Sequence, residues 1–97
     1  MINDILSYSN FNELLEQNQS LIVVFISKVN YDLNKILLDL NQTKLKVYLV
    51  NVDDLLALKT KYKIKQTPTL VVFENQTAIF NTCKLNLISE ILKQDKL

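Results

Sequence analysis

The most reactive side chain in this sequence is that of Cys83, the only cysteine among the 97 residues. A thiolate can attack a disulfide, and the ammonium group of the adjacent Lys84 would favour the thiolate form. A single cysteine excludes an intramolecular disulfide, although an intermolecular one is possible. Two interpretations follow. Either Cys83 forms an adduct with a low-molecular-weight thiol, or it is a small, partly buried apolar side chain.

Other groups that usually carry chemistry are missing from the sequence. There is no histidine, so general acid or base catalysis near neutral pH would need a carboxylate or a lysine with a strongly shifted pKa. One cysteine without histidine cannot form a tetrahedral zinc site of these ligands within one chain. We therefore expect no metal ion and no cofactor.

The charges of the chain are nearly balanced. Eleven lysines stand against ten acidic residues, which leaves a net charge of +1 and no overall field that would hold a polyanion. Lysines near the C-terminal end of a helix interact favourably with the helix dipole. We interpret one group of alternating lysines in this way, as the solvated end of a helix. These residues are Lys59, Lys61, Lys63 and Lys65. No nucleic-acid binding is predicted.

No segment has the pattern of a membrane span or an export signal. Apolar runs such as residues 21–26 are too short to cross a bilayer. Asn3 and Asp4 interrupt the apolar residues at the start, so a signal peptide is not expected. The sequence predicts a single domain over residues 1–97, located in the cytoplasm and without membrane binding.

Hydrophobic patterns predict three strands and a two-stranded hairpin. Residues 2–7 are typical of a short edge strand, and the continuous apolar run 21–26 is typical of a central strand buried on both faces. Residues 45–52 predict a third strand. Two apolar runs on either side of residues 74–77 predict a hairpin. Because the chain has no glycine, Asn75 is expected to take a left-handed turn conformation there.

Helices are predicted between these strands. Apolar residues recur at intervals of three and four over residues 31–42, which indicates an amphipathic helix. A final helix is expected from about Leu85 to Lys93. Two further helices are expected to begin where side chains can accept hydrogen bonds from free N–H groups. The candidates are Ser9 or Asn10 for the first, and Asp53 or Asp54 for the second.

The predicted order is β-α-β-α-β-α-β-β-α, an α/β fold with a central mixed sheet flanked by helices. This order resembles the thioredoxin fold, and two stretches strengthen the resemblance. Residues 50–53, Val-Asn-Val-Asp, are similar to the family's passage from a central strand into the next helix. Residues 61–70, Lys-Tyr-Lys-Ile-Lys-Gln-Thr-Pro-Thr-Leu, are similar to the family's Lys-Tyr-Gly-Ile-Arg-x-x-Pro-Thr-Leu before its hairpin.

The resemblance implies where a site would lie. Pro68, the only proline, would be cis and would face the family's active-site turn, and Thr67 would offer its backbone N–H and C=O to an extended peptide. Asn30 and Leu33 take the positions of the family's two active-site cysteines. Thiol–disulfide exchange needs an attacking and a resolving thiol. The chain thus resembles a thioredoxin-like protein that lacks the Cys-x-x-Cys motif, and it is not expected to be a dithiol–disulfide oxidoreductase.

Three further positions depart from the family pattern that the resemblance implies. Val24 replaces a buried Asp beneath the cysteines, and Leu49 replaces a nearby Lys. Lys63 stands where the family often has glycine after a helix. Either Lys63 adopts a left-handed conformation or the helix ends differently.

Asn30 and Asp32 have two interpretations. Both side chains can stabilise the start of the helix, Asn30 as its cap and Asp32 through the helix dipole. Alternatively, they take part directly in binding a ligand or partner.

Two classes of function remain. In the first, the protein is a redox-inactive binding or scaffold module, and a groove beside the cis-proline loop contacts a protein segment or a second copy of the chain. The groove would consist of Val29, Asn30, Tyr31, Thr67, Pro68 and Thr82. In the second, the protein is a single-cysteine redox protein or sensor, and the resemblance brings Cys83 next to the same loop. Only the second class requires the sulfur, so Cys83→Ser separates them.

Overall fold

A computed structural model of the protein describes residues 2–5, 7–27 and 33–94. These residues form a five-stranded sheet with the strand order β1-β3-β2-β4-β5. The elements follow one another as β1 (Ile2–Ile5), α1 (Tyr8–Gln17), β2 (Ser20–Ile26), α2 (Leu33–Gln42), β3 (Val47–Asn51), α3 (Leu56–Lys61), β4 (Thr69–Glu74), β5 (Thr77–Thr82) and α4 (Leu85–Leu92). The predicted order of strands and helices is confirmed.

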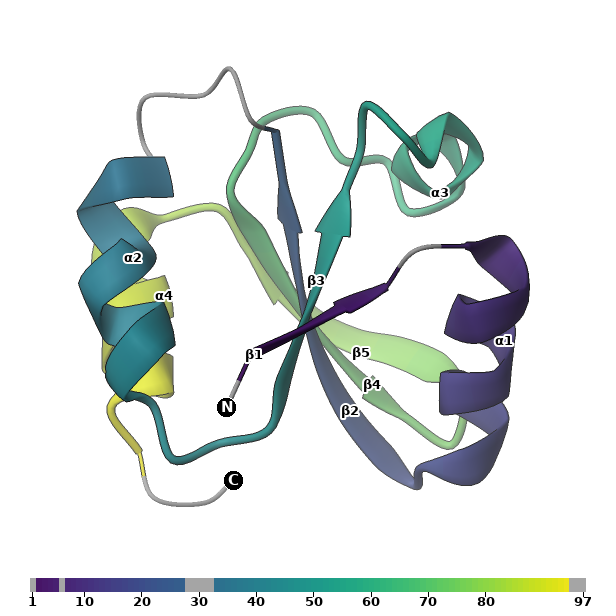
Figure 1. Ribbon diagram of the computed structural model, residues 1–97, viewed down its shortest axis with the longest axis horizontal. Coiled ribbons are helices and arrows are strands. Elements are labelled where there is room, and N and C mark those ends of the chain that lie inside the picture. The colour runs from purple at the N-terminus through teal and green to yellow at the C-terminus, as the bar shows by residue number, and fades with distance from the viewer. Residues whose placement is uncertain (1, 6, 28–32, 95–97) are drawn as a thin grey trace.

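The sheet is mixed. β3 pairs in parallel with both β1 and β2, whereas β4 pairs antiparallel with β2 and with β5. Helices α2 and α4 cover one face, and α1 and α3 cover the other (Figure 1). The predicted α/β class with a mixed central sheet is therefore confirmed.

Strand β2 lies at the centre of the sheet and contributes side chains to a hydrophobic core on each face. Leu21, Val23 and Phe25 belong to the core under α1 and α3. The alternating residues Ile22, Val24 and Ile26 belong to the core under α2 and α4. Each such burial stabilises the fold by about 1.5–3 kcal/mol. The unbroken apolar run of β2 is thus explained by burial on both faces.

Two predicted helix caps are wrong. Helix α1 begins at Tyr8, and the Ser7 side chain is its cap, accepting a hydrogen bond of 3.0 Å from the Asn10 N–H. Helix α3 begins after Leu55 and has no side-chain cap. Asn51 instead shapes the turn before α3, because its side-chain oxygen accepts from the Asp53 N–H at 3.0 Å.

Several boundaries also differ from the prediction. Strand β1 ends at Ile5 rather than residue 7, because Ser7 caps the following helix. Strand β3 covers Val47–Asn51, inside the predicted range 45–52. Helix α2 is described from Leu33, and its predicted start near Tyr31 lies outside the described residues.

The turns are made without glycine. Asn75 and Gln76 have φ of 50° and 69° in the β4–β5 turn, so the left-handed conformation predicted for Asn75 is confirmed. Lys63 has φ of 55° after α3. The Ile64 N–H donates to the Lys59 carbonyl at 2.9 Å, and the Lys63 N–H donates to the Thr60 carbonyl at 3.2 Å. These bonds form a Schellman motif in which lysine occupies the position that usually favours glycine.

No helix in the described part of the chain is both long enough and apolar enough to cross a membrane.

Candidate functional site

Three strand ends meet at one end of the sheet. β2 and β5 finish there and β4 begins there, since Phe25 pairs with Thr69 and Leu70 pairs with Thr82. The segments that continue from these strands, including the loop before β4, therefore lie close together. This end of the sheet is the candidate site.

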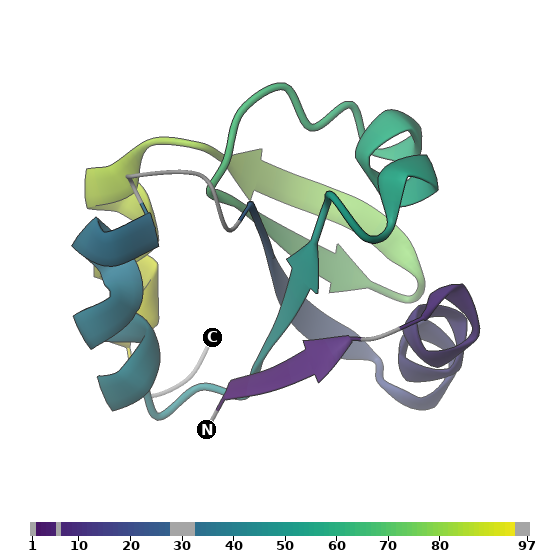
Figure 2. The same ribbon diagram turned by 45° about the horizontal axis from the view of Figure 1, so that its top comes forward.

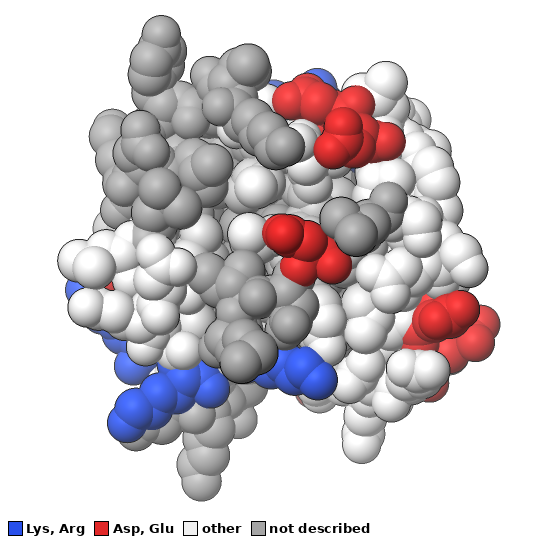
Figure 3. Space-filling model, viewed as in Figure 1, with Lys and Arg blue, Asp and Glu red and all other residues white. Residues whose placement is uncertain are grey.

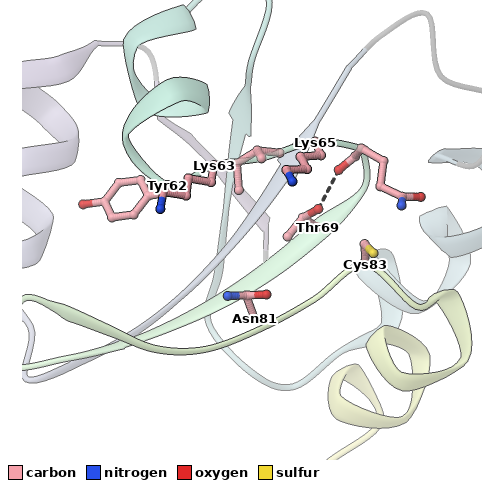
Figure 4. A pocket seen from close by; sticks show the side chains of 8 residues that line it. Tyr62, Lys63, Lys65, Thr69, Asn81 and Cys83 are labelled. Atoms are coloured by element: carbon pink, nitrogen blue, oxygen red, sulfur yellow. Dashed lines mark hydrogen bonds between the residues drawn. The ribbon is translucent and has the colours of Figure 1, made fainter.

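The loop before β4 has a defined conformation. The Thr67–Pro68 peptide bond is cis, Pro68 is buried and Thr67 is half-buried. The Thr69 hydroxyl donates a hydrogen bond of 2.6 Å to the Gln66 carbonyl across the loop, drawn as a dashed line in Figure 4. Thr69 is itself buried, so this bond holds the loop against the sheet.

A pocket of about 320 Å³ lies beside this loop. Its wall comes from the segment between α3 and β4 on one side and from the end of β5 on the other (Figure 4). The lining residues are Tyr62, Lys63, Ile64, Lys65, Gln66, Thr69, Asn81 and Cys83. Cations, amides and a thiol thus share one pocket with the aromatic ring of Tyr62.

Cys83 is exposed, so the expectation of partial burial is wrong. Cys83 lies beyond the end of β5. Thr82, the last residue of this strand, pairs with Leu70 and is only 8% exposed, whereas residues 77–81 and Cys83 are all exposed. The Thr82 hydroxyl accepts a hydrogen bond of 3.2 Å from the Lys84 N–H, which fixes the turn into α4.

The predicted groove stays a prediction, because none of its described residues lines the pocket. Thr67, Pro68 and Thr82 lie at the same end of the sheet, with Pro68 and Thr82 buried and Thr67 half-buried. Three other predicted groove residues, Val29, Asn30 and Tyr31, lie outside the described residues, as does Asp32. Leu33 is the first residue described in α2.

Sequence reasoning missed most of the pocket lining. Lys65, Gln66, Thr69 and Asn81 line the pocket but were not candidate site residues. Two of these residues are close to candidates in the sequence, since Thr69 follows Thr67 by two residues and Asn81 precedes Cys83 by two residues.

Two positions behind the site are part of the core. Val24 is completely buried beneath α2 and α4, and Leu49 packs against the same core. Neither side chain can accept or donate a proton. Val24 and Leu49 therefore provide no titratable group to a ligand at this end of the sheet.

The lysines near the site do not form one continuous surface. Lys63 and Lys65 line the pocket beside the cis-proline loop. Lys61 lines a second pocket, of about 420 Å³, between α1 and the β4–β5 turn, and its Nζ lies 5.5 Å from the centre of the Tyr62 ring. On the face shown in Figure 3, acidic and basic side chains form separate small groups. No cluster of three or more His, Cys, Asp or Glu suited to a metal ion occurs in residues 2–5, 7–27 and 33–94.

Comparison with known proteins identifies the fold. No family model matches the sequence, and no curated protein matches it. Among solved structures, a thioredoxin from Plasmodium falciparum is 18% identical and has a TM-score of 0.81 over 94% of this chain and 96% of that chain. The thioredoxin of Fasciola hepatica is 14% identical, with a TM-score of 0.80 over 93% and 95% of the two chains.

A third solved structure agrees. The thioredoxin of Malassezia sympodialis is 19% identical, with a TM-score of 0.78 over 98% of this chain and 90% of that chain. Likeness at such low identity establishes the fold alone. The protein has a thioredoxin-like fold, and because Cys83 is its only cysteine it has no Cys-x-x-Cys motif.

Proposed function

We propose that the protein is a redox-inactive thioredoxin-like module that binds an extended segment of a partner protein beside its cis-proline loop. The observation that carries this proposal is the pocket of about 320 Å³ between that loop and the end of β5, in a chain with one thiol. Disulfide exchange through a dithiol needs a second thiol to resolve the mixed disulfide. A pocket that has charged and hydrogen-bonding groups but no second thiol is better suited to binding a peptide segment than to exchanging disulfides.

The lining suggests which kind of segment would bind. Lys63 and Lys65 are exposed and can pair with carboxylates of a bound segment. The exposed amides of Gln66 and Asn81 can both donate and accept hydrogen bonds, as a peptide backbone requires. The favoured partner is therefore an extended segment that carries at least one acidic side chain. Val29, Asn30 and Tyr31 stay predicted contributors to the same groove.

Peptide binding tests this proposal. Extended peptides selected from a displayed library against the immobilised protein would be titrated into isotope-labelled protein and followed by amide chemical shifts. We expect the largest shift changes at residues 63–69 and 81–83. Gln66→Trp adds a large side chain at the rim of the pocket and should weaken binding at least about tenfold.

Gln17→Trp is the matched control, because Gln17 is also an exposed glutamine and lies at the end of α1. This variant should bind within about twofold of the unmodified protein. Shift changes centred on α1 or α2, or equal effects of the two tryptophan variants, would contradict binding at the cis-proline loop.

A second function is favoured by one observation. Cys83 is exposed and lines the same pocket as Lys63 and Lys65. In this alternative the Cys83 thiolate attacks one sulfur of a small-molecule disulfide, a mixed disulfide forms, and the other half leaves as a thiolate. Cys83→Ser abolishes this reaction but should leave peptide binding within about twofold.

A further inference from the structure

Strand β5 forms an open edge of the sheet. It is the last strand in the order β1-β3-β2-β4-β5 and pairs with β4 on its inner side. Among the described residues, no strand pairs with its outer side. Figure 2 shows β5 on the side of the sheet opposite to β1. The outer N–H and C=O groups of such a strand can form a ladder with another strand.

This edge lacks the charges that usually prevent pairing. Residues 75–83 contain no Lys, Asp or Glu and no proline, whereas natural edge strands are commonly protected by such residues. The other edge strand, β1, carries the exposed Asp4. The difference makes β5 the edge that is open to association.

The side chains of β5 expose apolar surface. Ile79 is 55% exposed and Phe80 is 45% exposed. A β-bulge lies here, since Val72 pairs with Phe80 and Phe73 pairs with Ala78, which leaves Ile79 as the additional residue. Bulges often protect an edge, but this bulge presents an apolar side chain instead of a charge. Contact with another apolar strand would remove this surface from water.

Two opposite charges lie near the two ends of β5, one on the neighbouring strand β4 and one beyond Thr82. Glu74 lies at the hairpin end, where it pairs with Thr77, and Lys84 lies two residues beyond Thr82 at the other end. Both are exposed. If two β5 strands pair antiparallel about their centre, Thr77 of one copy lies opposite Thr82 of the other. Glu74 of each copy then lies at the same end of the paired strands as Lys84 of the other.

We propose that two copies of this chain associate through antiparallel pairing of their β5 strands, which forms a two-fold symmetric dimer with one continuous sheet. The surface is complementary to itself, as a two-fold interface requires. The apolar residues Ile79 and Phe80 lie at its centre, with a Glu74–Lys84 pair at each end. The proposal does not require peptide binding beside the cis-proline loop, although Asn81 belongs both to β5 and to that pocket.

Charge reversal tests this dimer. The association constant would be measured by sedimentation equilibrium over roughly 1 µM to 1 mM protein. Lys84→Glu turns both end pairs into repulsive ones and should weaken association about tenfold. Glu74→Lys should do the same, and the double variant Glu74→Lys/Lys84→Glu should recover the affinity to within about threefold.

Two further variants complete the experiment. Phe80→Lys adds a charge to the open edge and should yield a monomer throughout the concentration range. The control pair Glu13→Lys and Lys59→Glu changes exposed charges on α1 and α3 and should leave association unchanged. Circular dichroism of each variant at the lowest concentration verifies that it is folded.

Three outcomes would overturn the proposal. The first is an unmodified protein that is monomeric at about 1 mM. The second is a dimer that the folded Phe80→Lys variant does not weaken. The third is a dimer that Lys84→Glu weakens without recovery in the double variant, because the pairing of Glu74 with Lys84 would then be wrong.

Discussion

Ser27 and Asp53 are joined by a hydrogen bond of 2.7 Å from the Ser27 Oγ to the Asp53 Oδ2. Ser27 directly follows β2 and is buried, whereas Asp53 follows β3 and is exposed. Nearby, the Val52 N–H donates to the Ile26 carbonyl at 2.9 Å. The ends of two parallel strands are thus fastened together next to the candidate site.

Replacing Ser27 should cost stability. Ser27→Ala removes the donor to a carboxylate, and we expect the free energy of unfolding to fall by about 1–2 kcal/mol in urea titrations. Ser9→Ala is the control, because Ser9 is exposed on α1 and should change this free energy by less than about 0.5 kcal/mol. Equal effects of the two substitutions would show that the Ser27 hydrogen bond contributes nothing.

Lys63 should be replaceable by glycine with a gain in stability. Its φ of 55° places a side chain in the left-handed region, which costs about 1–2 kcal/mol for residues other than glycine. Glycine also has a more flexible unfolded state. The net gain in unfolding free energy for Lys63→Gly should therefore be about 0.5–1 kcal/mol.

Lys65→Gly is the comparison for Lys63→Gly. Lys65 is also an exposed lysine of the pocket, but it does not have a positive φ. Both variants would be compared by thermal and urea titrations, and we expect no gain in unfolding free energy for Lys65→Gly. A loss of stability for both variants would mean that contacts of the Lys63 side chain stabilise the fold by more than its left-handed conformation destabilises it.

Local features of the chain were partly predictable from its sequence. The apolar run of β2 and the left-handed Asn75 followed from hydrophobic pattern and turn chemistry, and both agree with the structure. The cap of α1 was misplaced because Ser7, Ser9 and Asn10 are all suitable cap residues. Sequence spacing alone does not say which of them precedes the first helical turn.

The pocket could not be predicted for a different reason. Lys65 and Asn81 line the same pocket although they are far apart in the sequence. Their proximity depends on the pairing of β4 with β5 and on the path of the loop before β4. The exposure of Cys83 depends likewise on where β5 ends, because Thr82 is its last residue and is buried, whereas Cys83 lies beyond the strand. No local feature of the sequence indicates that these two segments lie together.

Cys83 should react freely in the native protein. Its exposure predicts that a chromogenic disulfide reagent labels the folded chain completely, at a rate within about tenfold of the denatured chain. Cys83→Ser should change the free energy of unfolding by less than about 0.5 kcal/mol. Labelling that requires denaturant would contradict an exposed thiol at the end of β5.

The central claim is that this thioredoxin-like fold carries no dithiol chemistry, and reduction of insulin by dithiothreitol tests it most directly. The protein, its Cys83→Ser variant and an authentic thioredoxin would be compared at equal concentration by the turbidity of the reduced insulin. We predict that the protein and the variant add nothing to the rate with dithiothreitol alone, whereas the thioredoxin accelerates it. Clear acceleration by the protein that disappears in Cys83→Ser would contradict the account and make Cys83 a catalytic residue.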